Sequence, residues 1–411
     1  MKCGLLGKKL SHSYSPQIHS YLGEYEYTLK EVQPENLEDF FGNFDFTGIN
    51  VTIPYKKDVI PFCHVLTNCA QKMGAVNTIV QQKDGTRIGH NTDFFGFSSM
   101  VERMQIPLSG KKALVLGSGG ASVTAVAVLE ELNAQVTVIS RTGENNYDNL
   151  HLHSDASLIV NATPVGMYPN AGISPVDLDL FPNLEGVLDI VYNPAKTRLI
   201  LDAEERNIPC QNGLWMLIAQ AKEAAEWFTS TKINDDIIDA IYKKLQKQME
   251  NIILVGMPGC GKSTVGKMLA DKLGKVFVDA DEEIVKNAGM SIPDIFAKRG
   301  EAGFRQLETD ILRTLGQKSG QVIATGGGCV TRDENYALLH QNGTIYWLKR
   351  DLTKLPTDGR PLSQAVALEQ MYSVRRPMYD RFCDHIISND GNPEDAVNEI
   401  LKGYSYEDIS N

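Results

Sequence analysis

The chain has 411 residues, of which 42% are hydrophobic and 22% charged, and its formal net charge at pH 7 is −11. At roughly 150 residues per domain, this length predicts two or three globular domains. The acidic balance argues against non-specific binding of nucleic acid, which needs a basic surface. The seven cysteines lack metal-site spacing, no apolar run approaches the roughly 20 residues of a membrane span, and the N-terminus has no signal-peptide core. We therefore expect a cytoplasmic protein with small-molecule partners, without nucleic acid or membrane.

Four polar segments follow one another between residues 11 and 93: SHSYSPQIH, INVTIPYK, GAVNT and GHNTD. Two of these segments also have a plain structural interpretation. INVTIPYK alone could be an edge strand with a solvated lysine, Lys56, and Asp93 of GHNTD alone could cap a helix. Together they place hydroxyl, amide, lysine and carboxylate groups in one part of the chain, which favours a polar binding site.

Short apolar runs alternate with helical stretches between about 110 and 195, which predicts a parallel sheet covered by helices. The first strand, KALVLG, leads into a glycine-rich loop and then a helix. This order places the N–H groups of a helix N-terminus where they can bind a pyrophosphate. The expected loop residues are Gly117, Ser118, Gly119, Gly120 and Ala121.

The next strand ends at Ser140, Arg141 and Thr142. An enzyme that prefers NAD usually carries an acidic residue here, whereas an arginine suits the 2′-phosphate of NADP. We therefore expect NADP, although Arg141 could also be an ordinary loop charge. The segment 143–157 is short, which predicts that a helix is lost there, and its two histidines have no third ligand for a metal.

Two helices are predicted from GLWMLIAQAKEAAEWF and INDDIIDAIYKKLQKQM. The second leads directly into a buried-strand run without a Pro- or Gly-rich linker, so we expect a boundary near Glu250. Strand runs then alternate with helices again, which predicts a second α/β unit.

The first strand of this second unit opens the sequence GMPGCGKS, which fits G-x-x-x-x-G-K-[ST] at every fixed position. Backbone N–H groups of such a loop surround phosphates, the lysine neutralises the transferred phosphate, and the serine binds Mg²⁺. The motif alone indicates ATP or GTP with Mg²⁺, and the resemblance described below implies ATP. The predicted nucleotide-binding residues are Gly256, Met257, Pro258, Gly259, Cys260, Gly261, Lys262, Ser263 and Thr264.

The segments of the first half, with Tyr192 in VLDIVYNP and Gln220 in LIAQA, resemble shikimate dehydrogenase over about residues 2–248. The resemblance implies a two-domain dehydrogenase with a Rossmann-type NADP domain. It implies carboxylate binding by Ser13 and Ser15, and hydrogen bonds to ring hydroxyls from Asn50, Thr52, Asn77 and Gln220, with Tyr192 helping to close the site. Lys56 and Asp93 would be the acid–base pair. Reduction of a ketone leaves an alkoxide that needs a proton, which a lysine held beside an aspartate can donate.

In the second half, VDADEEI, GFRQLE, TGGG and RRPMY follow the phosphate loop in an order that resembles shikimate kinase over about 251–403. The resemblance implies a P-loop fold like that of nucleoside monophosphate kinases. Asp281 would receive the acceptor hydroxyls, Arg305 and Arg375 would bind its carboxylate, and Asp279 would support Mg²⁺ through water. Gly326, Gly327 and Gly328 would let the backbone approach the ring, and Arg360 would be the lid arginine.

The segment KRDLTKLPTDGRPL departs from the kinase resemblance because it is short and lacks the arginine that usually packs on adenine. Lys354 is the basic residue that could substitute for it. In the first half no second basic residue follows Arg141 closely, which predicts weaker or less strict binding of NADP.

The predicted organisation is a dehydrogenase substrate domain at 1–100, completed by helices at about 212–249, a Rossmann-type domain at 101–211 and a P-loop domain at 250–411. The two resemblances name consecutive steps, reduction of 3-dehydroshikimate to shikimate and phosphorylation of shikimate to shikimate 3-phosphate. Three alternatives remain open: a first half that prefers quinate or NAD, a first half that serves as a regulatory binding module, and a second half that phosphorylates another small polyol.

Overall fold

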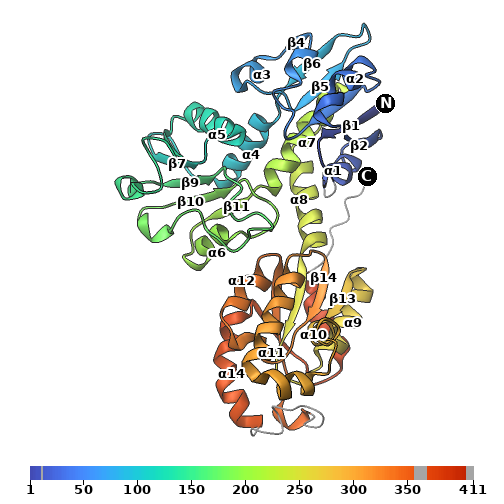
Figure 1. Ribbon diagram of the computed structural model, residues 1–411, viewed down its shortest axis with the longest axis vertical. Helices are drawn as coiled ribbons and strands as arrows, with labels where there is room; N and C mark the ends of the chain where they lie inside the picture. The colour runs from blue at the N-terminus through green and yellow to red at the C-terminus, as the bar shows by residue number, and fades with distance from the viewer. Residues whose placement is uncertain (11–12, 356–367, 404–411) are drawn as a thin grey trace. The chain divides into compact units, whose positions relative to one another are not determined.

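The computed structural model describes residues 1–10, 13–355 and 368–403, and they form two compact units (Figure 1). The first unit comprises Met1–Asn193 and Leu199–Lys243, and the second comprises Pro194–Arg198 and the chain from Lys244 onward. Both units are α/β, as the alternation of strand and helix patterns predicts.

The first sheet has six strands in the order β2-β1-β3-β5-β6-β4. Strand β5 is antiparallel to both of its neighbours, and the other pairs are parallel. The strands are β1 (Lys2–Gly7), β2 (Glu26–Glu31), β3 (Gly48–Val51), β4 (Val65–Leu66), β5 (Thr78–Gln81) and β6 (Arg87–His90), and the accompanying helices are α1 (Ser15–Ser20), α2 (Leu37–Gly42) and α3 (Asn68–Met73). The polar segments predicted to form a site lie at the ends of these elements.

The second sheet has five parallel strands in the order β11-β10-β9-β7-β8. The strands are β7 (Lys112–Leu116), β8 (Gln135–Ile139), β9 (Leu158–Asn161), β10 (Gly186–Asp189) and β11 (Cys210–Asn212), and the helices are α5 (Gly120–Glu131) and α6 (Arg198–Glu205). Between β8 and β9 the structure has only the short 3₁₀ helix η3 (Leu150–His153), so the predicted loss of a longer helix is confirmed.

Helix α4 (Asp93–Met104) packs against α7 (Leu214–Thr229). Helix α7 and helix α8 (Asp236–Met249) correspond to the two amphipathic helices predicted from the sequence. Strand β12 (Asn251–Val255) begins two residues after α8 ends, which confirms the absence of a linker.

The second unit is built on a parallel sheet in the order β13-β14-β12-β15-β16. Its other strands are β13 (Val276–Asp279), β14 (Gln321–Ala324), β15 (Gly343–Lys349) and β16 (His385–Ser388), and its helices are α9 (Lys262–Leu273), α10 (Ala280–Ala288), α11 (Ile292–Gly316), α12 (Glu334–His340), α14 (Leu368–Phe382) and α15 (Pro393–Lys402). Helix α11 is kinked at Gly300, where φ is 67°.

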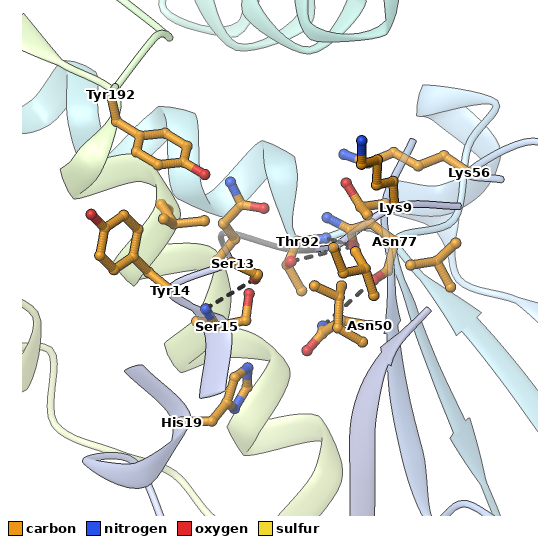
Figure 2. Close-up of a pocket in the computed structure, with 17 residues that line it drawn as sticks. Lys9, Ser13, Tyr14, Ser15, His19, Asn50, Lys56, Asn77, Thr92 and Tyr192 are labelled. Carbon is orange, nitrogen blue, oxygen red and sulfur yellow. Dashed lines mark hydrogen bonds between the residues drawn. The ribbon is translucent and has the colours of Figure 1, made fainter. Parts of the chain in front are cut away.

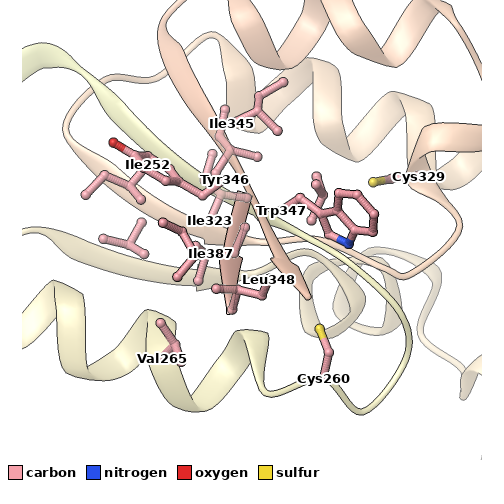
Figure 3. Packing of buried hydrophobic residues seen from close by; sticks show 14 of the residues in the cluster. Ile252, Cys260, Val265, Ile323, Cys329, Ile345, Tyr346, Trp347, Leu348 and Ile387 are labelled. Atoms are coloured by element: carbon pink, nitrogen blue, oxygen red, sulfur yellow. The ribbon is translucent and has the colours of Figure 1, made fainter. Parts of the chain in front are cut away.

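Buried residues of neighbouring strands form the core of this unit. Figure 3 shows Ile252, Ile323, Ile345 and Ile387, one from each of four adjacent strands, beside Trp347. Central strands of a parallel sheet are covered on both faces, which explains why β12 reads as a continuous apolar run. Its position fixes where the phosphate loop begins. Across the described ranges, the structure contains no helix with the length and apolarity to cross a membrane.

Candidate active sites

A cavity of about 420 Å³ in the first unit gathers the side chains predicted to bind a substrate (Figure 2). They come from the start of α1, the end of β3, the approach to β5, the loop after β10, and α7. The predicted residues that line the cavity are Ser13, Ser15, Asn50, Thr52, Lys56, Asn77, Tyr192 and Gln220. Segments that are far apart in the sequence therefore meet in one site.

Lys56 and Asp93 form an ion pair, with 2.7 Å between Nζ and Oδ2. The Asp93 side chain is only 12% exposed and that of Lys56 is 30% exposed, so water reaches the lysine more easily. Asp93 is the first residue of α4, where the helix dipole favours a carboxylate. Its N–H donates to Asn91 Oδ1 at 2.9 Å, which orients the start of the helix. Lys56 therefore lines the cavity, and Asp93, which does not line it, holds the lysine through the ion pair.

Two amides on the cavity wall are fixed by their neighbours. The Asn77 Oδ1 atom accepts hydrogen bonds from the backbone N–H of Thr92 at 2.8 Å and from its hydroxyl at 3.3 Å. Asn50 Oδ1 accepts from the Tyr27 hydroxyl at 2.8 Å, and Asn50 Nδ2 donates to Thr78 Oγ1 at 3.1 Å. Both amides are thus held in one orientation before a substrate arrives.

His19 lies on the same cavity wall and is almost fully buried. Its ring stacks on Tyr27 at 4.0 Å between centroids, and its Nδ1 is 2.6 Å from the Tyr25 hydroxyl. Burial lowers the pKa of His19 to about 3, because the charged form would lose its hydration. The imidazole is therefore neutral around pH 7 and contributes no charge to the cavity.

The glycine-rich loop lies between β7 and α5, as predicted. Gly117 has φ of 106°, a backbone conformation that favours glycine. Gly119 and Gly120 start α5, and nothing lies within 4 Å of where a Cβ would stand on either, so the loop leaves open space at the helix N-terminus. Ser118 is exposed there and Ala121 half-buried. This geometry fits a dinucleotide pyrophosphate.

The other predicted cofactor residues follow β8. Ser140 directly succeeds the strand, and Arg141 and Thr142 are exposed. No ion pair of Arg141 exists within the described residues, so its guanidinium is available to an anionic ligand. An exposed arginine at this strand end fits a 2′-phosphate.

A second cavity, of about 550 Å³, lies in the second unit over the loop between β12 and α9. Gly256, Gly259 and Gly261 of this loop have φ values of 144°, 83° and 102°. The Lys262 ammonium is buried and donates to the carbonyl oxygens of Gly256 and Met257 at 2.9 and 3.1 Å. The loop residues that line the cavity are Pro258, Gly259, Gly261, Lys262, Ser263 and Thr264.

Met257 and Cys260, also predicted to bind the nucleotide, belong to the hydrophobic core of the unit. Their side chains are therefore turned away from a ligand, and only their backbone can face it. Ser263 Oγ donates to Asp279 Oδ2 at 2.7 Å. A hydroxyl and a carboxylate so close together are suitable oxygen ligands, directly or through water, for Mg²⁺.

The far end of the second cavity is lined by Asp281, Arg305, Arg375 and the three glycines Gly326–Gly328. A Cβ on Gly326 would lie 2.8 Å from Asp281 Oδ1, and one on Gly328 would lie 2.1 Å from Arg305 Nη2. Glycine is therefore required at these two positions, because any side chain there would collide with Asp281 or Arg305. A Cβ on Gly327 would meet Pro258 of the phosphate loop at 2.6 Å.

The Asp281 carboxyl is the proton-accepting candidate at this end. Burial, and secondly the nearby Asp279 carboxylate, raise the pKa of Asp281, whereas Lys262 and Arg305 oppose the shift. A carboxylate with a raised pKa is a better base than an ordinary one. Arg360, predicted as the lid arginine, lies outside the described residues.

Comparisons with known proteins found relatives of both halves of the chain. Residues 5–79 match the shikimate dehydrogenase substrate binding domain. The shikimate dehydrogenase (NADP(+)) of Clostridium beijerinckii is 32% identical over 268 residues, which are 60% of this chain and 98% of that relative. The chain belongs to the shikimate dehydrogenase family. Residues 258–404 match the shikimate kinase model, so the chain also carries a shikimate kinase domain.

Solved structures support the dehydrogenase part. Shikimate dehydrogenase 1 of Peptoclostridium difficile is 36% identical with a TM-score of 0.55, and the match covers 60% of this chain and 98% of that one. The shikimate 5-dehydrogenase of Thermus thermophilus, solved in complex with NADP(H) and shikimate, is 30% identical with a TM-score of 0.54, covering 59% and 99%. These matches establish the Rossmann-type fold of the NADP part.

Sequence reasoning missed several residues of the two sites. In the dehydrogenase part, Thr92 and His19 line the cavity, although both lie inside segments singled out from the sequence. In the kinase part, Glu308 lines the cavity and pairs with Arg305, and it stands in the GFRQLE segment. Arg350 also lines that cavity, and it stands in the segment KRDLTKLPTDGRPL, where sequence reasoning assigned it no role. Position inside a recognised segment could have suggested all four residues.

Proposed function

We propose that the first unit reduces 3-dehydroshikimate to shikimate with NADPH. The observation that carries this proposal is the Lys56–Asp93 ion pair at a cavity lined with hydroxyls and amides. Bound NADPH supplies the hydride. Lys56 then donates a proton from Nζ to the oxygen that becomes a hydroxyl, and Asp93 keeps the ammonium in place until that moment.

The remaining residues bind and orient the substrate. Ser13 and Ser15 donate to its carboxylate; the Ser15 N–H is already bonded to Ser13 Oγ at 3.2 Å, which holds the two serines together. Asn50, Thr52, Asn77 and Gln220 bond the ring hydroxyls. Tyr192 contacts the Tyr14 ring edge to face at 6.2 Å and closes the cavity on the side of the loop after β10.

NADP(H) would be held through the loop Gly117–Ala121 and the strand end Ser140–Thr142. The open helix N-terminus at Gly119 and Gly120 would bind the pyrophosphate, and the exposed Arg141 would bind the 2′-phosphate.

The second unit, in this proposal, phosphorylates the 3-hydroxyl of shikimate with ATP. Asp281 accepts the hydroxyl proton, and its raised pKa suits that role. Arg305 and Arg375 bind the carboxylate from α11 and α14, and the Gly326–Gly328 backbone lets the ring approach. Lys262 neutralises the transferred phosphate, and Arg360, which lies outside the described residues, is the lid arginine that the resemblance implies. Ser263 and Asp279 would hold Mg²⁺, which neutralises phosphate charge when bound.

The two activities fit one chain because the product of the first is the substrate of the second. We assign residues 1–100 with 212–249 to the dehydrogenase substrate domain, 101–211 to the NADP domain and 250–411 to the kinase domain. The partners are then small molecules. The seven cysteines form no disulfide among the described residues, which agrees with a reducing cytoplasmic location.

A coupled assay on the full chain tests both activities. It contains 3-dehydroshikimate, NADPH, ATP and Mg²⁺, and follows NADPH by absorbance and shikimate 3-phosphate by mass. NADPH loss with phosphorylated product supports both proposals. NADPH loss with accumulating shikimate would contradict the kinase proposal alone. Phosphorylation of added shikimate without NADPH loss would contradict the reductase proposal and favour a regulatory first unit or another cofactor, which a comparison with NADH and quinate distinguishes.

A further inference from the structure

Arg350 is a cation of the kinase cavity that neither motif nor resemblance explains. It follows β15 directly and lines the cavity together with the phosphate loop. Its Nε is buried and has no hydrogen-bond partner, and its guanidinium makes no ion pair within the described residues. A buried donor without a partner is costly, which points to a ligand that satisfies it.

The backbone places Arg350 at the nucleotide end of the cavity. Strand β15 pairs with β12, with Trp347 opposite Val255, the last strand residue before the phosphate loop. The Leu348 carbonyl oxygen lies only 2.5 Å from where a Cβ would stand on Gly256. The chain segment that ends in Arg350 therefore runs directly against the start of the phosphate loop.

Asn389 holds the end of β15 and the phosphate loop together by two hydrogen bonds. Its N–H donates to the Lys349 carbonyl at 2.8 Å, and its Nδ2 donates to the Cys260 carbonyl at 2.7 Å. One residue thus ties the end of β15 to the middle of the phosphate loop. The backbone next to Arg350 is therefore held beside the loop.

The other cations of the cavity have different roles. Arg305 pairs with Glu308 at 2.7 Å, and Arg375 Nη1 donates to the Gly327 carbonyl at 3.1 Å, both at the acceptor end. Lys262 is held by loop carbonyls. A triphosphate carries several negative charges, and within the described lining Lys262 and Arg350 are the cations beside the phosphate loop.

The same region argues against Lys354, the basic residue that the sequence offered as a substitute for the missing arginine that usually packs on adenine. Its Nζ donates to the Asp390 carbonyl at 2.9 Å, and it does not line the cavity. The turn that carries it is also tied to Asp390, because the Asp351 N–H donates to Asp390 Oδ1 at 2.6 Å.

We propose that Arg350 binds the phosphate groups of the nucleoside triphosphate. A guanidinium presents two parallel donors that match two phosphate oxygens, and it stays charged when desolvated. The inference rests on the proposed kinase function, and it assigns this residue to the nucleotide, not to the acceptor.

The test uses the full chain and the variants Arg350→Ala, Arg350→Lys, Lys354→Ala and Lys349→Ala. Lys349 is the matched control, since it is an adjacent, exposed lysine that does not line the cavity. Calorimetry measures binding of ATP, inorganic triphosphate and adenosine, and initial rates give KM for ATP and for shikimate. Arg350→Ala should weaken ATP and triphosphate binding by roughly ten- to hundredfold, the effect expected for a lost hydrogen bond to a charged group. Arg350→Lys should lose less, because charge remains.

Binding of adenosine and the KM for shikimate should stay within about threefold in every variant, and Lys349→Ala and Lys354→Ala should bind ATP like the wild type. Unchanged ATP binding in Arg350→Ala overturns the inference. An equal loss of adenosine binding would show that Arg350 stacks on the base. A selective rise in the KM for shikimate would show that Arg350 contacts the carboxylate of the acceptor. Either result also overturns the inference. If the wild type binds triphosphate through Arg350 but does not phosphorylate shikimate, the proposed function fails and this inference stands.

Discussion

Glu308 holds Arg305 through one carboxylate oxygen and leaves the other without a partner. Oε2 accepts from Arg305 Nη1 at 2.7 Å, whereas Oε1 is buried and unpaired. The two residues are three apart on α11, so they lie on the same helix face. Burial raises the pKa of Glu308, and the neighbouring arginine opposes that rise. Glu308 thus orients Arg305 before an acceptor binds, while its own Oε1 atom still lacks a hydrogen-bond partner.

Glu308→Gln should raise the KM for shikimate about tenfold with little change in the KM for ATP. The amide keeps the shape of the side chain but no longer attracts and orients the Arg305 guanidinium, a loss of about 1–2 kcal/mol. Steady-state kinetics with each substrate varied in turn checks this. Glu301→Gln is the control, because Glu301 is more than half exposed and 3.5 Å from Arg305. If the two variants have the same KM for shikimate, Glu308 does not position the arginine.

Lys56→Ala should slow the reductase reaction by about 10²–10⁴-fold at saturating substrate, the usual contribution of a general acid. Phosphorylation of added shikimate by the same preparation should be unchanged. Lys57→Ala is the matched control, since Lys57 is exposed and does not line the cavity. A Lys56→Ala enzyme with nearly full reductase activity would remove the proposed proton donor.

Gly328→Ala should raise the KM for shikimate at least tenfold, because the added Cβ would stand 2.1 Å from Arg305 Nη2 and must displace the guanidinium. Gly391→Ala is the control. A Cβ there meets only Asp395 Oδ2, at 3.6 Å, an ordinary contact. Kinase kinetics and the reductase activity of both variants separate a local effect from unfolding. Normal shikimate binding in Gly328→Ala would mean that Arg305 is not the carboxylate ligand.

The kinase rate should depend on pH through Asp281. Its pKa is raised, so the fraction of the basic carboxylate falls as the pH drops through a range above the ordinary 3.8 of aspartate. The acid limb of the plot of log(kcat/KM) against pH should therefore fall at a higher pH than the limb expected for an exposed carboxyl. Asp279→Asn removes a negative neighbour and should move that limb to lower pH, even if the rate itself falls. If the acid limb of Asp279→Asn stays at the pH of the wild-type limb, a group other than Asp281 controls the pH dependence of the kinase rate.

Acid should destabilise the first unit through His19. Its pKa in the folded protein is about 3, below the ordinary 6.5, so below pH 6.5 the unfolded chain takes up a proton that the folded chain does not. Stability is then lost as the pH falls from 6.5 towards 3, by up to about 1.4 kcal/mol per pH unit. His19→Gln removes this contribution, so the difference in melting temperature between wild type and variant should narrow from pH 8 to pH 5.

The exposed His151 supplies the control for that measurement, as His151→Gln leaves the cavity untouched. A difference between wild type and His19→Gln that is constant with pH would show that His19 is not buried in solution.

Local patterns predicted much of this protein. The glycine-rich loop Gly117–Ala121 and the phosphate loop Gly256–Thr264 lie between a strand and a helix, as their sequences indicate. The two helices before Glu250 and the absence of a linker were also evident. These features depend on glycine conformations, helix periodicity and apolar runs, which a few neighbouring residues determine. The resemblance then indicated that Lys56 and Asp93 form a pair, and the structure places them 2.7 Å apart.

Tertiary structure decided which polar groups face each site. Lys354 and Arg350 are both basic and four residues apart, yet only Arg350 lines the kinase cavity. Likewise, Glu308 and Glu301 are both within reach of Arg305, but only Glu308 is buried against it. Nothing in the local sequence distinguishes these residues, because the direction of a side chain depends on strand register and on helices packed from distant parts of the chain.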